Sequence, residues 1–350
     1  MSSNSKSPSV LIVKIEPKIG DVFISLPFLY FVCNKFNNRF VFYVCSDTAA
    51  DLLKSFNLPP NLVVVKIGNF TNLFGYARVI FRIFSFIITR KFEVVYFPSV
   101  DLSILLSIVF TIFLRTPVIY FNQRGLRGFF RNPFAFAFGY SYILPIGEGC
   151  APFLFFFGYE KSFSIYSKYK SIASSNFKIR TVSTPQPFII ISPSAAEEKR
   201  KWPLDNYYQL CDCILSKTQF RIVFLQANKI FPPKTLEEAD RLSFLNVSIH
   251  QVMQLIHQCD LFVGNDSGLA HIAALFNKPC VVVSCHPIGG DPFHANSPTR
   301  FSPATDLKYV LQPTKPLDVS CATHCVSRDS HCIREINVND VVSCVFKLIA

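Results

Sequence analysis

The stretch Leu261-Phe-Val-Gly-Asn-Asp-Ser-Gly-Leu-Ala-His-Ile-Ala-Ala274 decides the fold class of this chain. Its first four residues predict a short buried strand, a polar turn follows at once, and a helix with an apolar face begins behind the turn. Such a turn leaves backbone N–H groups unpaired at the helix start, where the helix dipole favours an anion. The simpler interpretation is a capped core helix with a buried histidine. Because the polar residues are dense and lie between two apolar runs, we favour a phosphate site formed by Asp266, Ser267, Gly268, Leu269 and His271.

Apolar runs alternate with helix-like segments on both sides of this stretch. Strands are expected at 10–15, 40–44, 63–67, 94–97 and 118–121, with helices at 22–33, 47–55, 72–90 and 101–114. The pattern restarts with strands at 188–192, 221–225 and 280–284 and helices at 204–217, 251–259 and 337–349. Such alternation is typical of parallel sheets with crossover helices. We therefore predict an α/β protein with two doubly wound, Rossmann-like domains that face a central cleft, joined by a polar linker within 162–187.

The two halves of the 350-residue chain differ in charge and aromatic content. Residues 1–185 carry 20 Lys and Arg against 8 Asp and Glu, whereas residues 186–350 carry 15 of each. Of the 38 Phe residues, 28 lie in the first part. This part should face an anionic, partly apolar partner, and a membrane surface or phosphorylated lipid fits better than nucleic acid, for which no binding motif is present. Segments 78–90 and 129–138, where basic and apolar residues interleave, are the candidate membrane contacts.

The compartment is expected to be the cytoplasm. Residues 1–8 lack the apolar core of a signal peptide. The longest apolar run, at 102–114, is too short to cross a bilayer. The 12 cysteines show no spacing of a small secreted disulfide framework. We expect a cytoplasmic protein that touches the inner face of the cytoplasmic membrane.

Asp21 is the candidate catalytic residue. It follows Lys18, Ile19 and Gly20 in the turn between the first expected strand and its helix, at the carboxyl edge of the first sheet. Gly20 permits a sharp bend, and an aspartate in this position would ordinarily cap the helix. The functional alternative is a general base that projects toward a ligand.

A basic loop, Glu197-Glu-Lys-Arg-Lys-Trp-Pro203, lies between strand 188–192 and the next helix. Its cations, with nearby hydroxyls, could clamp a diphosphate, although a solvated run of charges is the simpler interpretation. The residues of this clamp would be Ser192, Ser194, Lys199, Arg200 and Lys201. Trp202, the only tryptophan, should pack the loop against the helix that follows.

The tail holds a cluster of Cys321, His324, Cys325, His331 and Cys332. Because the spacing matches no common zinc pattern, a disulfide or plain packing is favoured over metal binding. The chain also lacks a dinucleotide-binding glycine motif, a Walker A sequence and a D-x-D pair. We expect no metal ligands and no cofactor.

Three blocks together resemble the glycosyltransferases of family 9, the heptosyltransferases of lipopolysaccharide core assembly. They are Ile12-Val-Lys-Ile with Ile19-Gly-Asp-Val22 and Leu26-Pro27, then Lys199-Arg-Lys-Trp-Pro203, and last Val263-Gly-Asn-Asp-Ser-Gly-Leu-Ala-His271. The third block is the most specific. Because the blocks stand in the family's order near residues 20, 200 and 266, the resemblance covers most of the chain.

The resemblance implies the two-domain GT-B fold. Residues 1–178 would form the acceptor-binding domain and residues 179–350 the domain that binds the nucleotide-sugar. The implied reaction is an inverting, metal-independent transfer of a heptose, with ADP-heptose as donor and a lipopolysaccharide or lipooligosaccharide core as acceptor. Asp21 would be the base, Lys18 and Gly20 would belong to the acceptor-side loop, and the phosphate site and basic loop would hold the leaving diphosphate.

Two departures from the family leave alternatives open. Arg200 stands where the family usually has Lys, so which of Lys199, Arg200 and Lys201 contacts phosphate is undecided. The loop after strand 280–284 reads Cys285-His-Pro-Ile-Gly-Gly-Asp-Pro-Phe-His294, unlike the family's Phe-Gly-Pro-Thr, and His286, Asp291 and His294 are possible donor contacts. A related transferase with another donor sugar for a different surface glycan, and a non-catalytic glycan-binding module, are the alternative functions.

Overall fold

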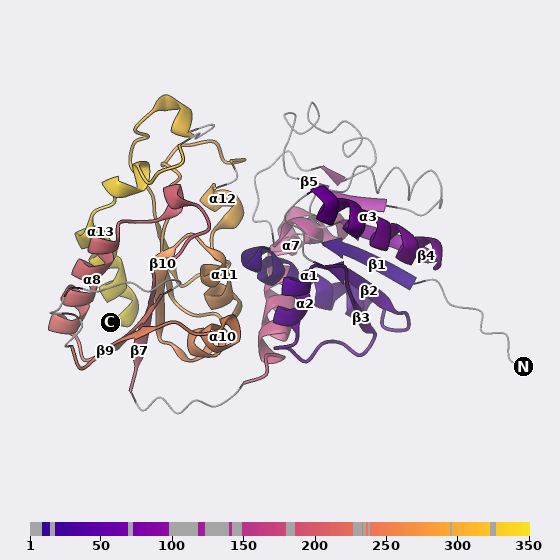
Figure 1. Ribbon diagram of the computed structural model, residues 1–350, viewed down its shortest axis with the longest axis horizontal. Helices are drawn as coiled ribbons and strands as arrows, with labels where there is room; N and C mark the ends of the chain where they lie inside the picture. Colours follow the sequence, from indigo (N-terminus) through magenta and orange to yellow (C-terminus); the bar gives the residue numbers. More distant parts are fainter. Residues whose placement is uncertain are drawn as a thin grey trace, which may run out of the picture. The chain divides into compact units, whose positions relative to one another are not determined.

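The computed structural model describes residues 9–14, 18–68, 73–97, 118–122, 140–141, 149–179, 186–226, 233, 236, 239–294, 296–322 and 327–350. The chain divides into two compact units, Met1–Lys178 and Ile179–Ala350. Each unit is built around a six-stranded sheet (Figure 1). All paired neighbours in both sheets run parallel. The predicted α/β class with doubly wound sheets is confirmed.

The first sheet has the strand order β3-β2-β1-β4-β5-β6. Its strands are β1 (Ser9–Lys14), β2 (Val41–Cys45), β3 (Leu62–Lys66), β4 (Phe92–Phe97), β5 (Val118–Asn122) and β6 (Tyr140–Ser141). The order reverses between β1 and β4, and open α/β sheets bind ligands at the carboxyl ends of the strands on either side of such a point. The turn that leads from β1 toward Asp21 therefore starts at the edge where this topology places ligands.

The helices of the first unit are α1 (Ile19–Lys35), α2 (Asp47–Leu53), α3 (Leu73–Ile88) and α7 (Ala151–Ser175). Helix α1 is buried along most of its length, because α7 packs on it. Phe28 and Phe31 of α1 lie 6.0 and 5.3 Å, between ring centroids, from Phe153 of α7. Part of the phenylalanine excess thus fills a core, where each ring buries a large apolar area, and does not face a partner.

Helix α7 corrects the predicted linker at 162–187. Residues 162–175 are helical, and Tyr166, Tyr169 and Ala173 are buried. Most of the Ser and Lys residues in this range are exposed or half-buried, although Ser162 is buried, so composition alone resembled a linker. The buried positions recur at helical spacing. The helix is interrupted at Gly158, whose φ of +70° is readily adopted by glycine.

The second sheet has the order β12-β11-β10-β7-β8-β9. Its strands are β7 (Phe188–Ser192), β8 (Arg221–Leu225), β9 (Leu242–Leu245), β10 (Leu261–Asn265), β11 (Cys280–Val283) and β12 (Lys308–Leu311). Numbered within their own units, the two sheets have the same order, and the second reverses between β7 and β10. Strands β9 and β12 were not expected, because each is a short, half-buried strand at a sheet edge with a weak apolar signal.

Helices cover both faces of the second sheet (Figure 1). Helices α8 (Leu204–Lys217) and α13 (Val338–Ile349) lie together on one face, and α10 (Ile249–Gln258) and α11 (Gly268–Leu275) lie on the other. The core under α8 and α13 includes Ile189, Val263, Leu210 and Val345, all fully buried. Both faces of the central strands are therefore apolar, and polar residues appear only where those strands end.

Three predicted features lie outside the described residues, namely the helix at 101–114, the basic aromatic segment at 129–138, and His324 with Cys325 of the tail cluster. Among the helices that the structure describes, none is both long enough and apolar enough to cross a membrane.

Candidate active site

The carboxyl ends of β7 and β10 carry the polar residues of the candidate site. These strands are neighbours at the point where the second sheet reverses, and Gly264 of β10 pairs with Ser192 of β7. A Cβ at Gly264 would lie 2.7 Å from the Ser192 carbonyl oxygen, so the close approach of the two strands requires glycine. The buried Ser192 hydroxyl has no hydrogen-bond partner among the described residues, and it is thus available to a ligand.

Asn265, the last residue of β10, connects three segments of this region by hydrogen bonds. Its buried side-chain amide donates to the Pro193 carbonyl (2.6 Å), and its Oδ1 accepts from the Trp202 backbone N–H (2.9 Å) and the Tyr207 hydroxyl (2.9 Å). Burial raises the pKa of Tyr207 well above its ordinary value, so the hydroxyl stays protonated and donates. One amide therefore holds the end of β10, the loop after β7 and the start of α8 together.

The start of α11 faces the end of the sheet. Ser267 precedes the helix in extended conformation, and its side chain makes no capping bond. Its buried hydroxyl is unpaired among the described residues, like that of Ser192. The first N–H groups of a helix, here including those of Gly268 and Leu269, face no helical carbonyl, and the dipole adds positive potential. Unpaired donors at a helix start form an anion site.

The basic loop is held by ion pairs. It contains the short 3₁₀ helix η2 (Glu198–Arg200). Arg200 donates to the Asp266 carboxylate (Nη2–Oδ2 2.9 Å) and to the Asp266 backbone carbonyl. In contrast, Lys199 pairs with Glu197 (3.0 Å) and the more exposed Lys201 pairs with Glu198 (2.6 Å). Arg200 is thus the cation that this structure attaches to the start of α11.

Asp266 therefore occupies a supporting position. It is buried, and its carboxylate lies against the Arg200 guanidinium. An ionised carboxylate repels a phosphate, but the pair as a whole is neutral. The Arg200 Nε, which makes no hydrogen bond within the described part of the chain, remains as a donor. Asp266 thus orients Arg200. The anion itself would be contacted by hydrogen-bond donors, namely the hydroxyls, the first N–H groups of α11 and Arg200.

The remaining predicted residues of this site are half-buried and lie within a few residues of the end of β7 or of the start of α11. Ser194 follows the end of β7, Leu269 is the second residue of α11 and His271 is the fourth. His271 has interactions of its own within the fold. The second unit thus presents its hydroxyls, amide N–H groups and Arg200 around the carboxyl ends of β7 and β10.

Asp21 does not cap its helix, contrary to the sequence-based interpretation. Helix α1 begins at Ile19, the cap position is the exposed Lys18, and no side chain makes a capping bond there. Asp21 lies in the first turn and is half-buried, as is Gly20. The helix begins at Ile19, three residues before the expected start at Val22. A carboxylate that is not used as a cap is available for chemistry.

The loop after β11 carries His286, Asp291 and His294. The rings of His286 and His294 stack with their centroids 5.0 Å apart. Burial lowers the pKa of His286, so its ring is neutral near pH 7. His286 and His294 line a small pocket together with Lys199, Cys321, His331 and Cys332. The structure thus joins this loop to the tail cluster.

Sequence reasoning missed the roles of Asn265 and Tyr207. Asn265 was assigned only to a polar turn, and Tyr207 to a helix face. A polar amide directly after an apolar strand was the available signal, because a buried amide must find partners. The prediction for Trp202 is confirmed, since its ring is 4.9 Å from that of Tyr207 in α8.

Comparison with known proteins confirms the resemblance that the three blocks indicate. Residues 157–286 match the family model of glycosyltransferase family 9 (heptosyltransferase). Lipopolysaccharide heptosyltransferase 1 of Campylobacter coli is 23% identical over 199 residues, which are 54% of this chain and 54% of that protein. Lipooligosaccharide heptosyltransferase 2 of Haemophilus ducreyi is 29% identical over 119 residues, 30% of this chain and 33% of that protein. The chain thus spans about half, or a third, of the curated relatives it matches.

The fold agrees along the whole chain. The E. coli heptosyltransferase WaaC with ADP superposes with a TM-score of 0.65 at 14% identity, over 97% of this chain and 99% of that one. The architecture is therefore that of GT-B heptosyltransferases. At 14% identity this similarity establishes the fold only. Any conclusion about the chemistry must rest on the residues described above.

Replacing Asn265 should loosen the basic loop. In Asn265→Ala the Trp202 N–H and the Tyr207 hydroxyl lose their shared acceptor, and buried unpaired groups cost about 1–3 kcal/mol each. We expect the free energy of unfolding to fall by about 2–4 kcal/mol. The emission of Trp202, the only tryptophan, should shift to the red as water reaches it.

Asn61→Ala is the matched control. The Asn61 amide donates to three backbone carbonyls in the first unit, those of Cys33, Phe36 and Arg39. This variant should lose stability without changing Trp202 emission. An unshifted emission and an unchanged denaturation midpoint in Asn265→Ala would contradict the role of Asn265.

Proposed function

We propose that this chain, similar to family 9 in residues 157–286 and GT-B in fold, is an inverting glycosyltransferase that moves a heptose from ADP-heptose to a lipopolysaccharide or lipooligosaccharide core. The observation that carries the proposal is the anion site at the ends of β7 and β10, with unpaired hydroxyls at Ser192 and Ser267, the first N–H groups of α11 and Arg200. These groups suit a diphosphate. That a similar fold holds ADP supports the choice of nucleotide.

In the proposed reaction a single displacement joins acceptor and sugar. Asp21 takes the proton of the acceptor hydroxyl as the oxygen attacks the anomeric carbon, and the bond from that carbon to the diphosphate breaks. One displacement inverts the anomeric centre. The charge that develops on the leaving diphosphate is balanced by the α11 N–H groups, His271 and Arg200, so the step itself requires no metal ion. The first unit would supply the acceptor side, including Lys18 and Gly20, and the second unit the donor side.

Asp21→Asn tests the base. The amide keeps the size of the side chain but cannot take a proton, so turnover should fall by about 10²–10⁴-fold. Binding of ADP, measured by calorimetry, should be unchanged because the donor groups lie in the second unit. Asp47→Asn is the matched control, since Asp47 also lies in the first turn of a helix that follows a strand of the same sheet.

The outcomes separate the alternatives. Full turnover in Asp21→Asn would remove Asp21 as base. Binding of another nucleotide-sugar in preference to ADP-heptose would favour a transferase for a different surface glycan. Absence of turnover in the unchanged protein with every donor, despite nucleotide binding, would favour the glycan-binding module.

Arg200 is proposed as the phosphate contact among the three basic residues. It is tied to Asp266 beside the start of α11, whereas Lys201 pairs with Glu198 at a more exposed position. Because a charged hydrogen bond contributes about 1.5–3 kcal/mol, Arg200→Gln should weaken ADP binding roughly 10- to 100-fold. Lys201→Gln should change it little. Equal losses in both variants, measured by calorimetry at one salt concentration, would mean that the loop acts only through its net charge.

A membrane surface is the proposed site of action, at the inner face of the cytoplasmic membrane. The outer side of α3 exposes Phe81 and Phe84 beside Arg78 and Arg82, with Phe81 69% exposed. Apolar rings between cations suit an anionic lipid surface, and the excess positive charge of residues 1–185 acts in the same direction. An acceptor that is anchored in lipid would be reached from such a surface.

Liposome flotation tests this surface. The protein should float with vesicles that contain anionic lipid and much less with neutral vesicles. Phe81→Ser combined with Arg78→Gln should reduce flotation severalfold, since both side chains are exposed and their loss leaves the core intact. Leu317→Ser, at a side chain that is 70% exposed in the second unit, is the control. Flotation that is equal for all three proteins would contradict the role of α3.

A further inference from the structure

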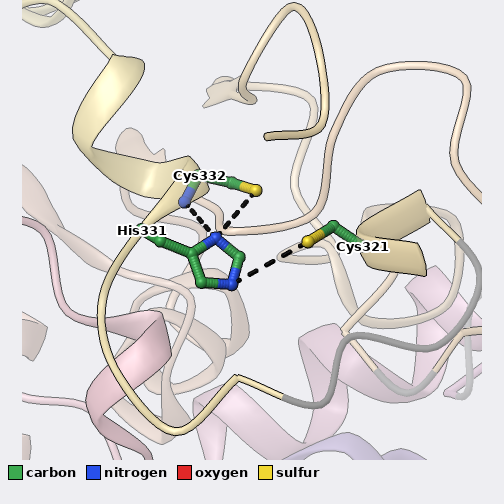
Figure 2. Close-up of side chains that lie close together, drawn as sticks. All are labelled: Cys321, His331 and Cys332. Atoms are coloured by element: carbon green, nitrogen blue, oxygen red, sulfur yellow. Dashed lines mark hydrogen bonds between the residues drawn. The ribbon is translucent and has the colours of Figure 1, made fainter. Parts of the chain in front are cut away.

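The tail of the second unit brings two thiols and an imidazole together. Cys321 belongs to the 3₁₀ helix η3 (Val319–Ala322), Cys332 begins η4 (Cys332–Glu335), and His331 caps η4. One ligand atom from each of the three side chains lies within 4.8 Å of the others. Figure 2 shows both sulfurs on the same side of the His331 ring, with Nε2 toward Cys321 (3.9 Å) and Nδ1 toward Cys332 (2.9 Å). Residues ten positions apart thus converge on one point.

The cluster is buried and reduced. Cys321 and Cys332 are 7% and 2% exposed, and both are free thiols. The Cys332 backbone N–H donates to His331 Nδ1 (2.5 Å), and the Leu317 N–H donates to the Cys332 sulfur (3.4 Å). Backbone bonds therefore fix the ring and one sulfur in place without a metal. In metal sites, hydrogen bonds of this kind to the ligand side chains hold those side chains in the orientation that the metal needs.

The donor set and its spacing suit a soft, tetrahedral ion. Zinc binds thiolate sulfur at about 2.3 Å and imidazole nitrogen at about 2.0 Å, so its ligand atoms lie about 3.5–3.8 Å apart. The observed separation of 3.9 Å between the Cys321 sulfur and His331 Nε2 is close to this range. Either nitrogen of the His331 ring can act as the zinc ligand once its present hydrogen bond is replaced by a bond to the metal. Hard cations prefer oxygen ligands, which this cluster lacks.

A fourth donor lies in the same pocket. His286, from the loop after β11, lines the pocket together with Cys321, His331 and Cys332. His286 is 3% exposed, and neither ring nitrogen has a hydrogen-bond partner among the described residues. A buried polar group without a partner is costly, and a metal bond would supply the missing interaction.

We propose that Cys321, His331 and Cys332 bind one zinc ion, and that His286, which lines the same pocket but lies outside the group of three converging side chains, moves closer to become the fourth ligand. Four protein ligands leave no position for a substrate, so the site is structural and takes no part in the glycosyl transfer. Binding releases the protons of both thiols as the two sulfur–zinc bonds form. The proposal departs from the sequence-based expectation, in which the spacing favoured a disulfide or packing, and it does not depend on the proposed function.

The ion would tie together segments that border the candidate donor site. The Asp291 N–H, in the loop after β11, donates to the Ala322 carbonyl of η3 (2.7 Å). The Ser330 hydroxyl, next to His331, donates to the Lys201 carbonyl of the basic loop (2.9 Å). Three segments are thus linked by single hydrogen bonds around the cluster. A zinc ion would hold these segments more firmly than those bonds do alone.

Metal analysis of the purified full chain is the direct test. The protein, prepared without a polyhistidine tag and under reducing conditions, should contain about one zinc ion per chain by mass spectrometry. Replacement of the zinc by Co²⁺ should give visible absorption with thiolate-to-metal bands. Cys321→Ser, Cys332→Ser and His331→Gln should lose the metal and these bands, and His286→Gln should lose zinc to a chelator faster than the unchanged protein.

Cys259→Ser is the matched control. Cys259 is buried, and its thiol donates to the Ile256 carbonyl (3.2 Å), a bond that serine can also make. This variant should keep the full zinc content. If the ligand variants fail to fold, the unchanged protein still tests the proposal. Removal of zinc by a chelator should lower its melting temperature and expose the thiols of Cys321 and Cys332 to alkylation. The proposal is overturned by a chain that takes up neither zinc nor Co²⁺, by a Cys321–Cys332 disulfide in the purified protein, or by full zinc content in Cys321→Ser.

Discussion

The side-chain amide of Asn265 is the interaction on which the candidate donor site depends. It stands at the end of a strand that is buried on both faces, where β10 must stop and the chain must turn into α11. Because its donor and acceptor are used by Pro193, Trp202 and Tyr207, three segments distant in sequence meet at one buried point. A buried amide is stable only when it is satisfied, so the arrangement is either complete or absent. The positions of the basic loop and of α11 follow from it.

The two units share one strand order but differ in the residues of their cores and at their strand ends. In the first unit the core is aromatic, and α1 contributes Phe28 and Phe31 to it while Asp21 stands in its first turn. In the second unit the buried strands β7 and β10 end in Ser192 and Asn265, and Asp266 follows β10. The reversal of strand order places the ends of β7 and β10 side by side in the second unit, and the turn toward Asp21 at the corresponding edge of the first.

Charge in the second unit is balanced locally. Each cation of the basic loop has a carboxylate partner, which explains how three consecutive basic residues stay folded against the sheet without a ligand. Only the Arg200 pair reaches the start of α11, so the three cations are not equivalent. In the neighbouring tail, two thiols and one imidazole converge, although their spacing in the sequence matches no common metal pattern.

The sequence by itself determined the central strands of both sheets, most of the helices beside them, the α/β class and the family resemblance. Apolar runs and the Asn265-Asp-Ser-Gly268 turn are local signals, whereas the short edge strands β9 and β12 gave none. It misjudged features that depend on partners distant in the chain. Helix α7 looked like a linker because only its contact with α1 makes its buried positions meaningful. For Asp21 the sequence left capping open beside the role of base, and Arg200 was not separable from Lys199 or Lys201. Only the tertiary structure decided these three features. Which side chains are buried and which ions pair depends on residues that are distant in the sequence and meet only in the folded protein.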